Sequence, residues 1–492
     1  MEFGWRRPGN QLHRDKCDCG FRAPIGDNET MSDTNQTIVP ERSSSSAIAT
    51  SKATKTRWVV LVLISLMYLI TYMDRSNISV AAPSIAKEFG LSKTAMGLVF
   101  SAFLWAYSIG QIPGGWLGDR FGPRRVLLSI IPIWSLIVAA TGVAVGVVSL
   151  IATRFFLGLF EAGAFPIATR AMQLWYPKSE RGRVHGITHS FSRFAVAVTP
   201  FVAVSILVAF GWRTIFYIFG AAGLLWSLAF YRFYRNLPEE HKNVNQRELA
   251  HIRGSNPDGT IKTAVDPHTR PAVPWKMIFR SPNMWYIAAG YCCFFYGTYF
   301  FLTWFPTYLL EYRHLSLKTL GTVASLPLLV GVVGDIVGGT LTDKVYRRTG
   351  KLKFARRVVA APGMLASGVC LIPAAMTHSA WAAITCLTAS LFFLELVIGP
   401  AWAVPMDVGG EYSGTVTGVM NMAGSLAASV SPVVFGLFAQ RGFWVAPFLV
   451  TAGVMLTGTV IWTFLINPEI SVVAAALPGT TRVENVKTVT VQ

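Results

Sequence analysis

The chain has 492 residues, of which 52% are hydrophobic and only 14% are charged, and its mean hydropathy is +0.45. This composition excludes a soluble globular protein and is typical of a protein that crosses a membrane many times. The net charge of +18 does not indicate a nucleic-acid-binding protein, because the basic residues fall in the gaps between apolar runs, where they act as topology signals.

The chain begins with a polar stretch that contains no apolar core of the kind found in signal peptides. A serine run at 43–46 and scattered charges are typical of a disordered segment. We therefore predict that residues 1–56 form a disordered cytoplasmic arm. Met31 offers an alternative start, in which case residues 1–30 do not belong to the physiological protein.

Apolar runs of about 20 residues, the length of a membrane-spanning helix, fill most of the remaining chain. A polar segment at 235–283 separates two sets of six runs, and we predict that it is a cytoplasmic connecting loop. The sequence thus predicts an all-α membrane protein with twelve transmembrane helices in two six-helix bundles, at 57–234 and 284–467, followed by a cytoplasmic tail at 468–492. The predicted spans are 58–82, 95–117, 126–147, 149–172, 184–209, 213–234, 284–309, 316–340, 356–377, 380–404, 413–439 and 442–466.

Lysine and arginine residues are distributed unevenly between the two sides of these spans. The N-terminal arm, the loops after the second, fourth and eighth spans, and the 235–283 segment hold most of them, whereas the opposite loops hold few. Because basic loops remain on the cytoplasmic side, we predict a multi-pass protein of the plasma membrane with both termini in the cytoplasm.

Four ionisable residues lie inside predicted spans, with Asp74 and Arg75 in the first and Arg154 and Glu161 in the fourth. A charge near the centre of a bilayer costs at least ~2.5 to 3.5 kcal/mol, so we expect these residues to face a shared polar cavity. Arg154 and Glu161 are seven positions apart, which on a helix directs both into the same space about 10 Å apart. This pattern indicates a polar ligand or a proton path; the alternative is a set of structural ion pairs between helices.

The charges of these four residues sum to zero when all of them are ionised. Protonation of both acids leaves a charge of +2, which favours an anion in a cavity of low dielectric. Uptake of protons and uptake of an anion therefore favour each other. Arginine suits this role because its planar fork can bind a carboxylate through two hydrogen bonds.

A sequence pattern after the second span recurs after the eighth. The first copy is Gly115-Trp-Leu-Gly118-Asp119-Arg120-Phe-Gly122-Pro-Arg124-Arg125, and the second, 224 residues later, is Gly339-Thr-Leu-Thr-Asp343-Lys344. Such a repeat indicates a transporter of two like bundles with the ligand site between them, although a generic charged membrane turn is the alternative. Glycine allows close helix approach, aspartate can complement a helix N-terminus, and the bases anchor the cytoplasmic side. The residues predicted to control the conformation are Gly115, Asp119, Arg120, Gly122, Arg124 and Asp343.

On these features, residues 57–467 resemble the major facilitator superfamily and, within it, the anion:cation symporter family, which includes bacterial sugar-acid transporters and the sialin and vesicular glutamate carriers. The chain looks like the galactonate, glucarate and hexuronate transporters at Tyr72-Met-Asp74-Arg75-Ser-Asn77, Tyr107, Arg154 with Glu161, Gly211-Trp-Arg213 and Asn421-Met-Ala-Gly424. The resemblance implies proton coupling at Asp74 and Glu161. It also implies that an anionic substrate is contacted by Tyr72, Arg75, Tyr107, Arg154 and Asn421.

Several residues depart from the pattern of this family. Arg193, Asp335 and Glu395 are further ionisable groups inside spans, and the sequence assigns them no role. Trp402 could stack on a substrate or anchor the chain at the membrane interface. A pair of histidines four positions apart, at 185 and 189, could hold a metal or relay protons, but we expect both to lie at the membrane interface.

These observations predict a secondary active transporter in a bacterial inner membrane that imports an organic anion, such as a hexonate, hexarate or hexuronate, together with protons. Its expected partners are the organic anion, protons and the lipid bilayer, with no nucleic acid, no metal and no cofactor. The alternatives are a drug or metabolite efflux antiporter on the same fold and a membrane enzyme or non-transporting sensor. The spans contain no nucleophile elbow, metal-ligand cluster or phosphate loop, so we do not expect an enzyme.

Overall fold

The structure is a computed structural model that describes residues 52–91, 93–254, 261, 272–305, 308–315, 323 and 325–473. Its elements are helices, which confirms the predicted all-α membrane fold. Most of the predicted N-terminal arm, the middle of the connecting loop and most of the C-terminal tail lie outside the described residues.

Eleven helical segments of the described chain are long and apolar enough to cross a membrane, and with α11 they correspond to the twelve predicted spans. The first half contains α2 (Thr56–Phe89), α3 (Lys93–Phe121), α4 (Pro123–Thr141), α5 (Val147–Glu161), α6 (Ala164–Trp175), α7 (Arg181–Phe210) and α8 (Trp212–Phe233). The second half contains α11 (Pro282–Thr303), the π-helix η3 (Tyr308–Tyr312), α14 (Leu326–Thr349), α15 (Leu352–Met376), α16 (Ala380–Glu395), α17 (Ile398–Val408), the short η4 (Gly410–Tyr412), α18 (Ser413–Gln440), α19 (Ala446–Val460) and the π-helix η5 (Ile461–Leu465).

The eighth span differs most from its predicted position. It was expected at 316–340, and α14 instead runs to Thr349, where Gly350 ends it with a left-handed φ of 68°. The predicted start at 316 lies outside the described residues. The helix continues past Asp343 and Lys344 because charged side chains end the apolar run without removing any backbone hydrogen bond; glycine at the C-terminus is what stops the helix.

Two spans are broken in the middle, at equivalent places in the two halves. The fourth span divides into α5, which ends at Glu161, and α6, and the tenth divides into α16, which ends at Glu395, and α17. Pro166 and Pro400 are each the third residue of the second segment. Proline has no N–H, and its ring clashes with the carbonyl group four residues earlier, so each proline interrupts the helix directly after its glutamate.

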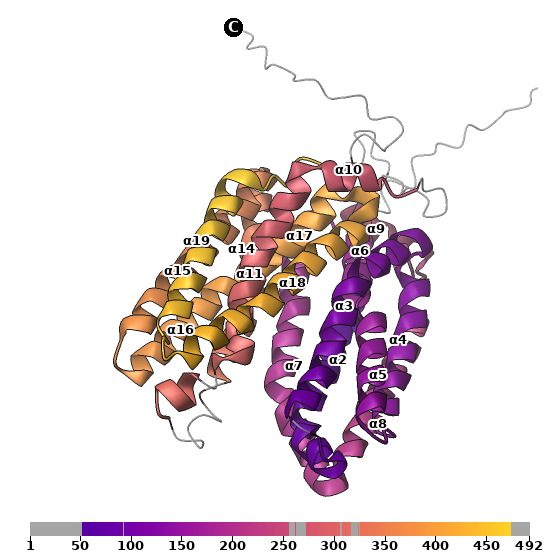
Figure 1. The fold of residues 1–492 in the computed structure, drawn as a ribbon. Coiled ribbons are helices and arrows are strands. Elements are labelled where there is room, and N and C mark those ends of the chain that lie inside the picture. The colour runs from indigo at the N-terminus through magenta and orange to yellow at the C-terminus, as the bar shows by residue number, and fades with distance from the viewer. Residues whose placement is uncertain are drawn as a thin grey trace, which may run out of the picture. The chain divides into compact units, whose positions relative to one another are not determined.

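The helices of each half pack with one another, and several contacts between helices join the halves. Figure 1 shows α2 to α8 gathered together and α11 to α19 gathered together. Within the halves, α3 packs along α5, α2 along α7, α11 along α18, and α15 along α16. Between the halves, α7 packs along α14 and α17, and α18 packs along α3 and α6. The junction is therefore built mainly from α3, α6 and α7 of the first half and α14, α17 and α18 of the second.

The described parts of the connecting segment contain η1 (Pro238–Glu240), α9 (Gln246–Arg253) and α10 (Trp275–Arg280). α10 packs against α11 of the second half, whereas α9 lies against the first half. Glu248 on α9 is fully buried and accepts hydrogen bonds from the backbone N–H groups of Thr56 and Arg57, at 3.2 and 3.0 Å, where α2 begins. A carboxylate at a helix N-terminus satisfies donors that the helix leaves free, so Glu248 joins α9 to the first span.

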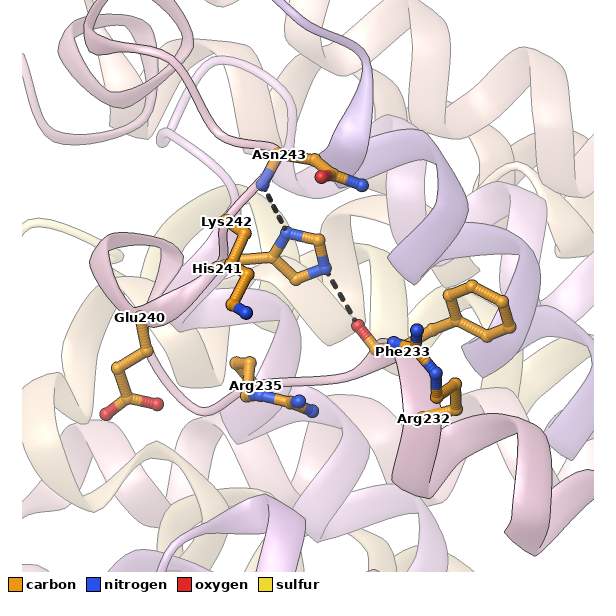
Figure 2. A pocket seen from close by; sticks show the side chains of 7 residues that line it. All are labelled: Arg232, Phe233, Arg235, Glu240, His241, Lys242 and Asn243. Carbon is orange, nitrogen blue, oxygen red and sulfur yellow. Dashed lines mark hydrogen bonds between the residues drawn. The ribbon is translucent and has the colours of Figure 1, made fainter.

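A histidine fixes the turn after α8, as Figure 2 shows. The Nδ1 of His241 accepts a hydrogen bond from the backbone N–H of Asn243 at 3.2 Å, so Nε2 carries the proton and donates to the carbonyl oxygen of Phe233 at 3.1 Å. The connecting segment also contains an ion pair. Burial alone would raise the pKa of Glu239, but hydrogen bonds from Arg253 hold that pKa below its ordinary value.

A surface pocket lies beside the turn after α8. It has a volume of about 310 Å³ and is lined by Arg232, Phe233, Arg235, Glu240, His241, Lys242 and Asn243.

Candidate functional site

A cavity lies at the junction of the two halves, inside the membrane-spanning helices. Its free volume is about 20 Å³, which is room for about one water molecule. A ligand the size of a sugar acid therefore needs side chains to move or the halves to separate. The cavity is lined by Tyr72, Arg75, Tyr107, Phe165, His189, Arg193, Tyr291, Phe295, Tyr299, Ile398, Trp402, Asn421 and Ser425.

Arg75 on α2 lies in the wall of this cavity and pairs with Glu161 at the end of α5. Its Nε is 2.5 Å from a carboxylate oxygen of Glu161, whose side chain is not exposed at all. The guanidinium carbon lies 4.2 Å from the centre of the Tyr107 ring and 4.9 Å from that of Tyr72, so aromatic faces stabilise the cation. Two predicted substrate-binding residues and one predicted proton-coupling residue thus surround the guanidinium of Arg75.

Asp74 and Arg154 lie beside this pair and do not line the cavity. Both are buried, with 1% and 3% exposure. Arg154 donates from Nη1 to the backbone oxygen of Asp74 at 3.4 Å, and its guanidinium faces the ring of Phe103 at 5.1 Å. Both carboxylate oxygens of Asp74 lack a hydrogen-bond partner among the described residues. The carboxylate of Glu161 therefore pairs with Arg75 on another helix, and not with Arg154 of its own helix.

A second ion pair lies in the cavity wall and joins the two halves. Nε and Nη2 of Arg193, on α7, donate to the two carboxylate oxygens of Glu395, on α16, at 3.0 Å each. The side chain of Arg193 is 3% exposed and that of Glu395 is not exposed. Asp335 on α14 is also fully buried and interacts electrostatically with both, while its carboxylate oxygens have no hydrogen-bond partner in the described part of the chain.

Aromatic side chains and a histidine form the remaining wall. Trp402 is 1% exposed and donates from its indole N–H to the hydroxyl of Tyr291 at 2.9 Å. His189 packs against it with the rings tilted by 49° and 4.6 Å between the ring centres. The interpretation of Trp402 as an interface anchor is therefore wrong, because the ring is buried at the junction. His185 and His189 are likewise buried among protein side chains, with 0% and 4% exposure.

Asn421 on α18 reaches the cavity from the second half. Its side-chain amide donates to Oε1 of Gln111, on α3, at 2.9 Å. This hydrogen bond is buried and connects the two halves at the level of the cavity. Among the described residues, no group of three or more histidine, cysteine, aspartate or glutamate side chains could hold a metal ion.

The aspartates of the repeated pattern each bind the helix of the opposite half. Asp119, near the end of α3, accepts hydrogen bonds from the backbone N–H groups of Gly414 and Thr415 at 3.0 and 2.6 Å, where α18 begins. Asp343, near the end of α14, accepts from Gly182 and Arg183 at 3.1 and 2.6 Å, where α7 begins. Both contacts place a negative charge at the positive end of a helix dipole.

Further ion pairs surround these contacts. We call this end of the bundles, where Asp119 and Asp343 lie, the basic end. Arg181 of the first half donates to Asp407 of the second at 2.8 Å. Arg356 donates to Asp407 at 3.1 Å and to Asp343 at 2.9 Å, and it also reaches the carbonyl oxygen of Lys178 at 3.3 Å. In this structure the two halves are therefore closed against each other at the basic end.

The other predicted conformation-controlling residues fall into two groups. Gly115 faces the opposite half, because a Cβ built on it would lie 2.2 Å from the backbone oxygen of Gly414. Gly122 and Arg124 act within the first half. Gly122 has a φ of 83° between α3 and α4, and Nε of Arg124 donates to the carbonyl oxygen of Tyr234 at 2.9 Å. Arg120 faces the ring of Trp116 at 5.3 Å.

Sequence reasoning left Arg193 and Glu395 unassigned, although the sequence contains a signal for the glutamate. Glu161 is followed five residues later by Pro166, and Glu395 is followed five residues later by Pro400. The same spacing occurs 234 residues apart, in the fourth and the tenth span. A search of the two halves for shared glutamate and proline positions would have identified Glu395.

Comparisons with known proteins agree with this architecture. Residues 64–432 match the family model of the Major Facilitator Superfamily. The chain is 42% identical over 419 residues to the probable sulfoacetate transporter of Cupriavidus necator, covering 85% of this chain and 95% of that relative. It is 35% identical over 407 residues to the probable galactarate/D-glucarate transporter of Escherichia coli, covering 80% and 89%. Its fold is similar to that of a proton:xylose symporter, with a TM-score of 0.66 and 15% identity over 84% of this chain and 96% of the other.

Proposed function

Because the chain belongs to the major facilitator superfamily, we propose that it is a secondary active transporter that takes up an organic anion of the sugar-acid kind together with protons. The names of its relatives, which include probable transporters of sulfoacetate and of galactarate and D-glucarate, support an organic acid as the substrate. The observation that carries the proposal is the pair of Arg75 and Glu161, whose arginine lines a cavity inside the membrane-spanning bundle.

In this mechanism Glu161 and the substrate compete for Arg75. The guanidinium can bind a substrate carboxylate through two hydrogen bonds only after Glu161 releases it. Protonation of Glu161 removes the competing charge, so that a proton and an anion replace one internal ion pair. Asp74 is a second proton acceptor in the same cluster, since its buried carboxylate has no hydrogen-bond partner among the described residues. Tyr72, Tyr107 and Asn421 then offer polar groups to the substrate.

The mechanism also needs a second conformation, in which the contacts at the basic end are broken. Opening that end requires Asp119 and Asp343 to leave the N-termini of α18 and α7. The distribution of lysine and arginine supports a cytoplasmic basic end, so in this proposal the cytoplasmic side is the closed one. The proposed location is a plasma membrane, such as a bacterial inner membrane, with both termini in the cytoplasm.

The test is uptake by the purified full-length protein in liposomes. An inward proton gradient should drive accumulation of radiolabelled sulfoacetate, glucarate or galactonate, and a protonophore should abolish it. The efflux alternative predicts the opposite direction, with substrate leaving as protons enter. Uptake that does not depend on the proton gradient would contradict proton coupling. Failure of organic anions to enter under any gradient would contradict anion transport.

A further inference from the structure

We propose that Arg193 is a second anion-binding position in the cavity, and that the substrates which bind best therefore carry two acidic groups, one for Arg75 and one for Arg193. The proposal rests on the transport function above and specifies its substrate class.

Arg193 shares the features that identify Arg75 as an anion-binding residue. Both side chains line the same cavity. Each is paired with a glutamate whose side chain has no exposure. Arg193 binds both oxygens of Glu395 at 3.0 Å. A carboxylate or sulfonate of a ligand can reproduce this two-pronged geometry.

The two glutamates occupy equivalent places in the repeat. Glu161 ends α5 and Glu395 ends α16, each directly before a break enforced by a proline. The two halves therefore each supply one internal carboxylate at the level of the cavity, and each carboxylate occupies one arginine. Because both glutamates fill positions that anions can take, the closed cavity resembles a site in which two acidic groups are already bound.

A purely structural pair would not account for this arrangement. The attraction within a buried ion pair is largely offset by desolvation, so that well-packed apolar side chains would stabilise the junction equally well. Arg193 also belongs to the first half and Glu395 to the second, so separation of the halves must break their contact. A substrate group that replaces Glu395 leaves Arg193 paired during that movement.

Asp335 gives Glu395 an alternative partner when it leaves Arg193. α14 packs directly against Glu395, since a Cβ built on Gly334 would lie 3.1 Å from the Cβ of Glu395. Asp335 is the next residue, it is fully buried, and its two carboxylate oxygens have no hydrogen-bond partner among the described residues. Two neighbouring carboxyl groups can share one proton through a hydrogen bond, so Glu395 need not remain as an isolated buried charge.

The experiment compares ligands that differ in one acidic group. Glucarate and gluconate have the same six-carbon chain, and gluconate carries a hydroxymethyl group in place of the second carboxylate. Sulfoacetate and glycolate form a smaller pair, in which a hydroxyl replaces the sulfonate. Affinities are measured on the purified full-length protein by thermal shift, since a ligand that binds the folded state raises its melting temperature.

In the wild-type protein we expect the dianion of at least one pair to bind roughly tenfold or more tightly than its monoanion, the ratio typical of one further charge-assisted contact. The double variant Arg193→Gln with Glu395→Gln removes both charges and leaves neither unpaired. It should bind the dianion roughly tenfold more weakly and change the monoanion little, so that the ratio approaches one. Glu395→Gln alone frees Arg193 and should tighten dianion binding only. The single variant Glu395→Gln therefore tests whether Arg193 binds an anion even if the double variant does not fold.

Glu88→Gln is the matched control, because Glu88 pairs with Arg213 at the surface, with side-chain exposures of 40% and 39%, and does not line the cavity. If the wild-type protein binds the dianion and the monoanion of each pair equally well, Arg193 is not a second anion-binding position. The same conclusion follows if the double variant weakens binding of the dianion and the monoanion equally. Binding of monoanions alone would overturn the second position while leaving anion transport intact. If none of these or other organic anions binds or is transported, the proposed function fails as well.

Discussion

Each arginine of the cavity is held by a glutamate at the end of a half-helix. Arg75 contacts Glu161 and Arg193 contacts Glu395, and neither glutamate is exposed. Breaking such a pair by removing one partner leaves a buried charge without compensation, which is costly. A substrate anion avoids that cost because it takes the place of the glutamate. The chemistry proposed for the site is therefore an exchange of one carboxylate for another on the same guanidinium.

The first prediction compares lysine substitutions at two buried arginines. Arg75→Lys should keep the charge and the fold yet weaken binding of the transported anion roughly tenfold or more, because an ammonium group cannot form the two-pronged contact. Arg154→Lys should weaken binding less, since Arg154 contacts the backbone of Asp74 and does not line the cavity. Thermal shift with the same anion measures both. A larger loss for Arg154→Lys would assign the substrate carboxylate to Arg154.

Most residues of the candidate site could be named from the sequence, but their pairing could not. Charges inside apolar spans are conspicuous, so Asp74, Arg75, Arg154 and Glu161 stand out directly. Helical spacing relates residues of one helix only. It placed Arg154 and Glu161 on the same face, but it could not show that Glu161 pairs with Arg75 on α2. Contacts between helices depend on rotation and depth, which a single sequence does not contain.

At the scale of elements, paired glycines set how closely the two halves approach at the basic end. A Cβ built on Gly115 would lie 2.2 Å from the backbone oxygen of Gly414, and one built on Gly339 would lie 2.2 Å from that of Gly182. Both neighbours are backbone atoms, so no side chain can rotate away to make room. The repeat thus contains one close backbone contact in each half, next to the aspartate that binds the facing helix.

The second prediction uses these contacts. Gly115→Ala and Gly339→Ala should each hinder closure of the basic end, so that transport falls roughly tenfold or more for a cost of at least ~1.4 kcal/mol in the closed state. Binding of the anion should change less than transport. Gly453→Ala on α19 is the control, because a Cβ there meets no atom within 4 Å. Normal transport by both variants would show that the close approach is not needed for the cycle.

Helix positions were largely predictable because an apolar run of membrane length can satisfy its backbone only as a helix. The exceptions have local causes. α14 runs past the end of its apolar run to Gly350, and prolines divide the fourth and tenth spans after Glu161 and Glu395. The breaks matter most for function, since they bring each glutamate to the end of a helix, and both prolines are visible in the sequence once the two halves are compared.

For the whole molecule, the proposed transport mechanism has the basic end facing the cytoplasm. The third prediction places single cysteines in a variant that lacks the native ones. Lys242→Cys in the connecting segment should resist an impermeant thiol reagent in intact cells and react after the cells are opened, because the residue is exposed at the basic end. Val145→Cys should react in intact cells, since Val145 is 85% exposed in the loop between α4 and α5. The reverse labelling would overturn the orientation.

The central claim is that a proton on Glu161 releases Arg75 to the substrate, and Glu161→Gln tests it most directly. Glutamine resembles the protonated acid and cannot compete for the guanidinium. Binding of the anion should therefore survive, while uptake driven by a proton gradient should fail, because release requires the carboxylate to return. Exchange of labelled for unlabelled anion needs no net proton movement and should persist.

The decisive measurement determines gradient-driven uptake and anion exchange on Glu161→Gln in the same liposomes, with Glu88→Gln as the control. We expect Glu161→Gln to exchange the anion without concentrating it, whereas the control does both. Concentrative uptake by Glu161→Gln at the wild-type rate would contradict proton coupling at Glu161, whatever the affinity of this variant for the anion.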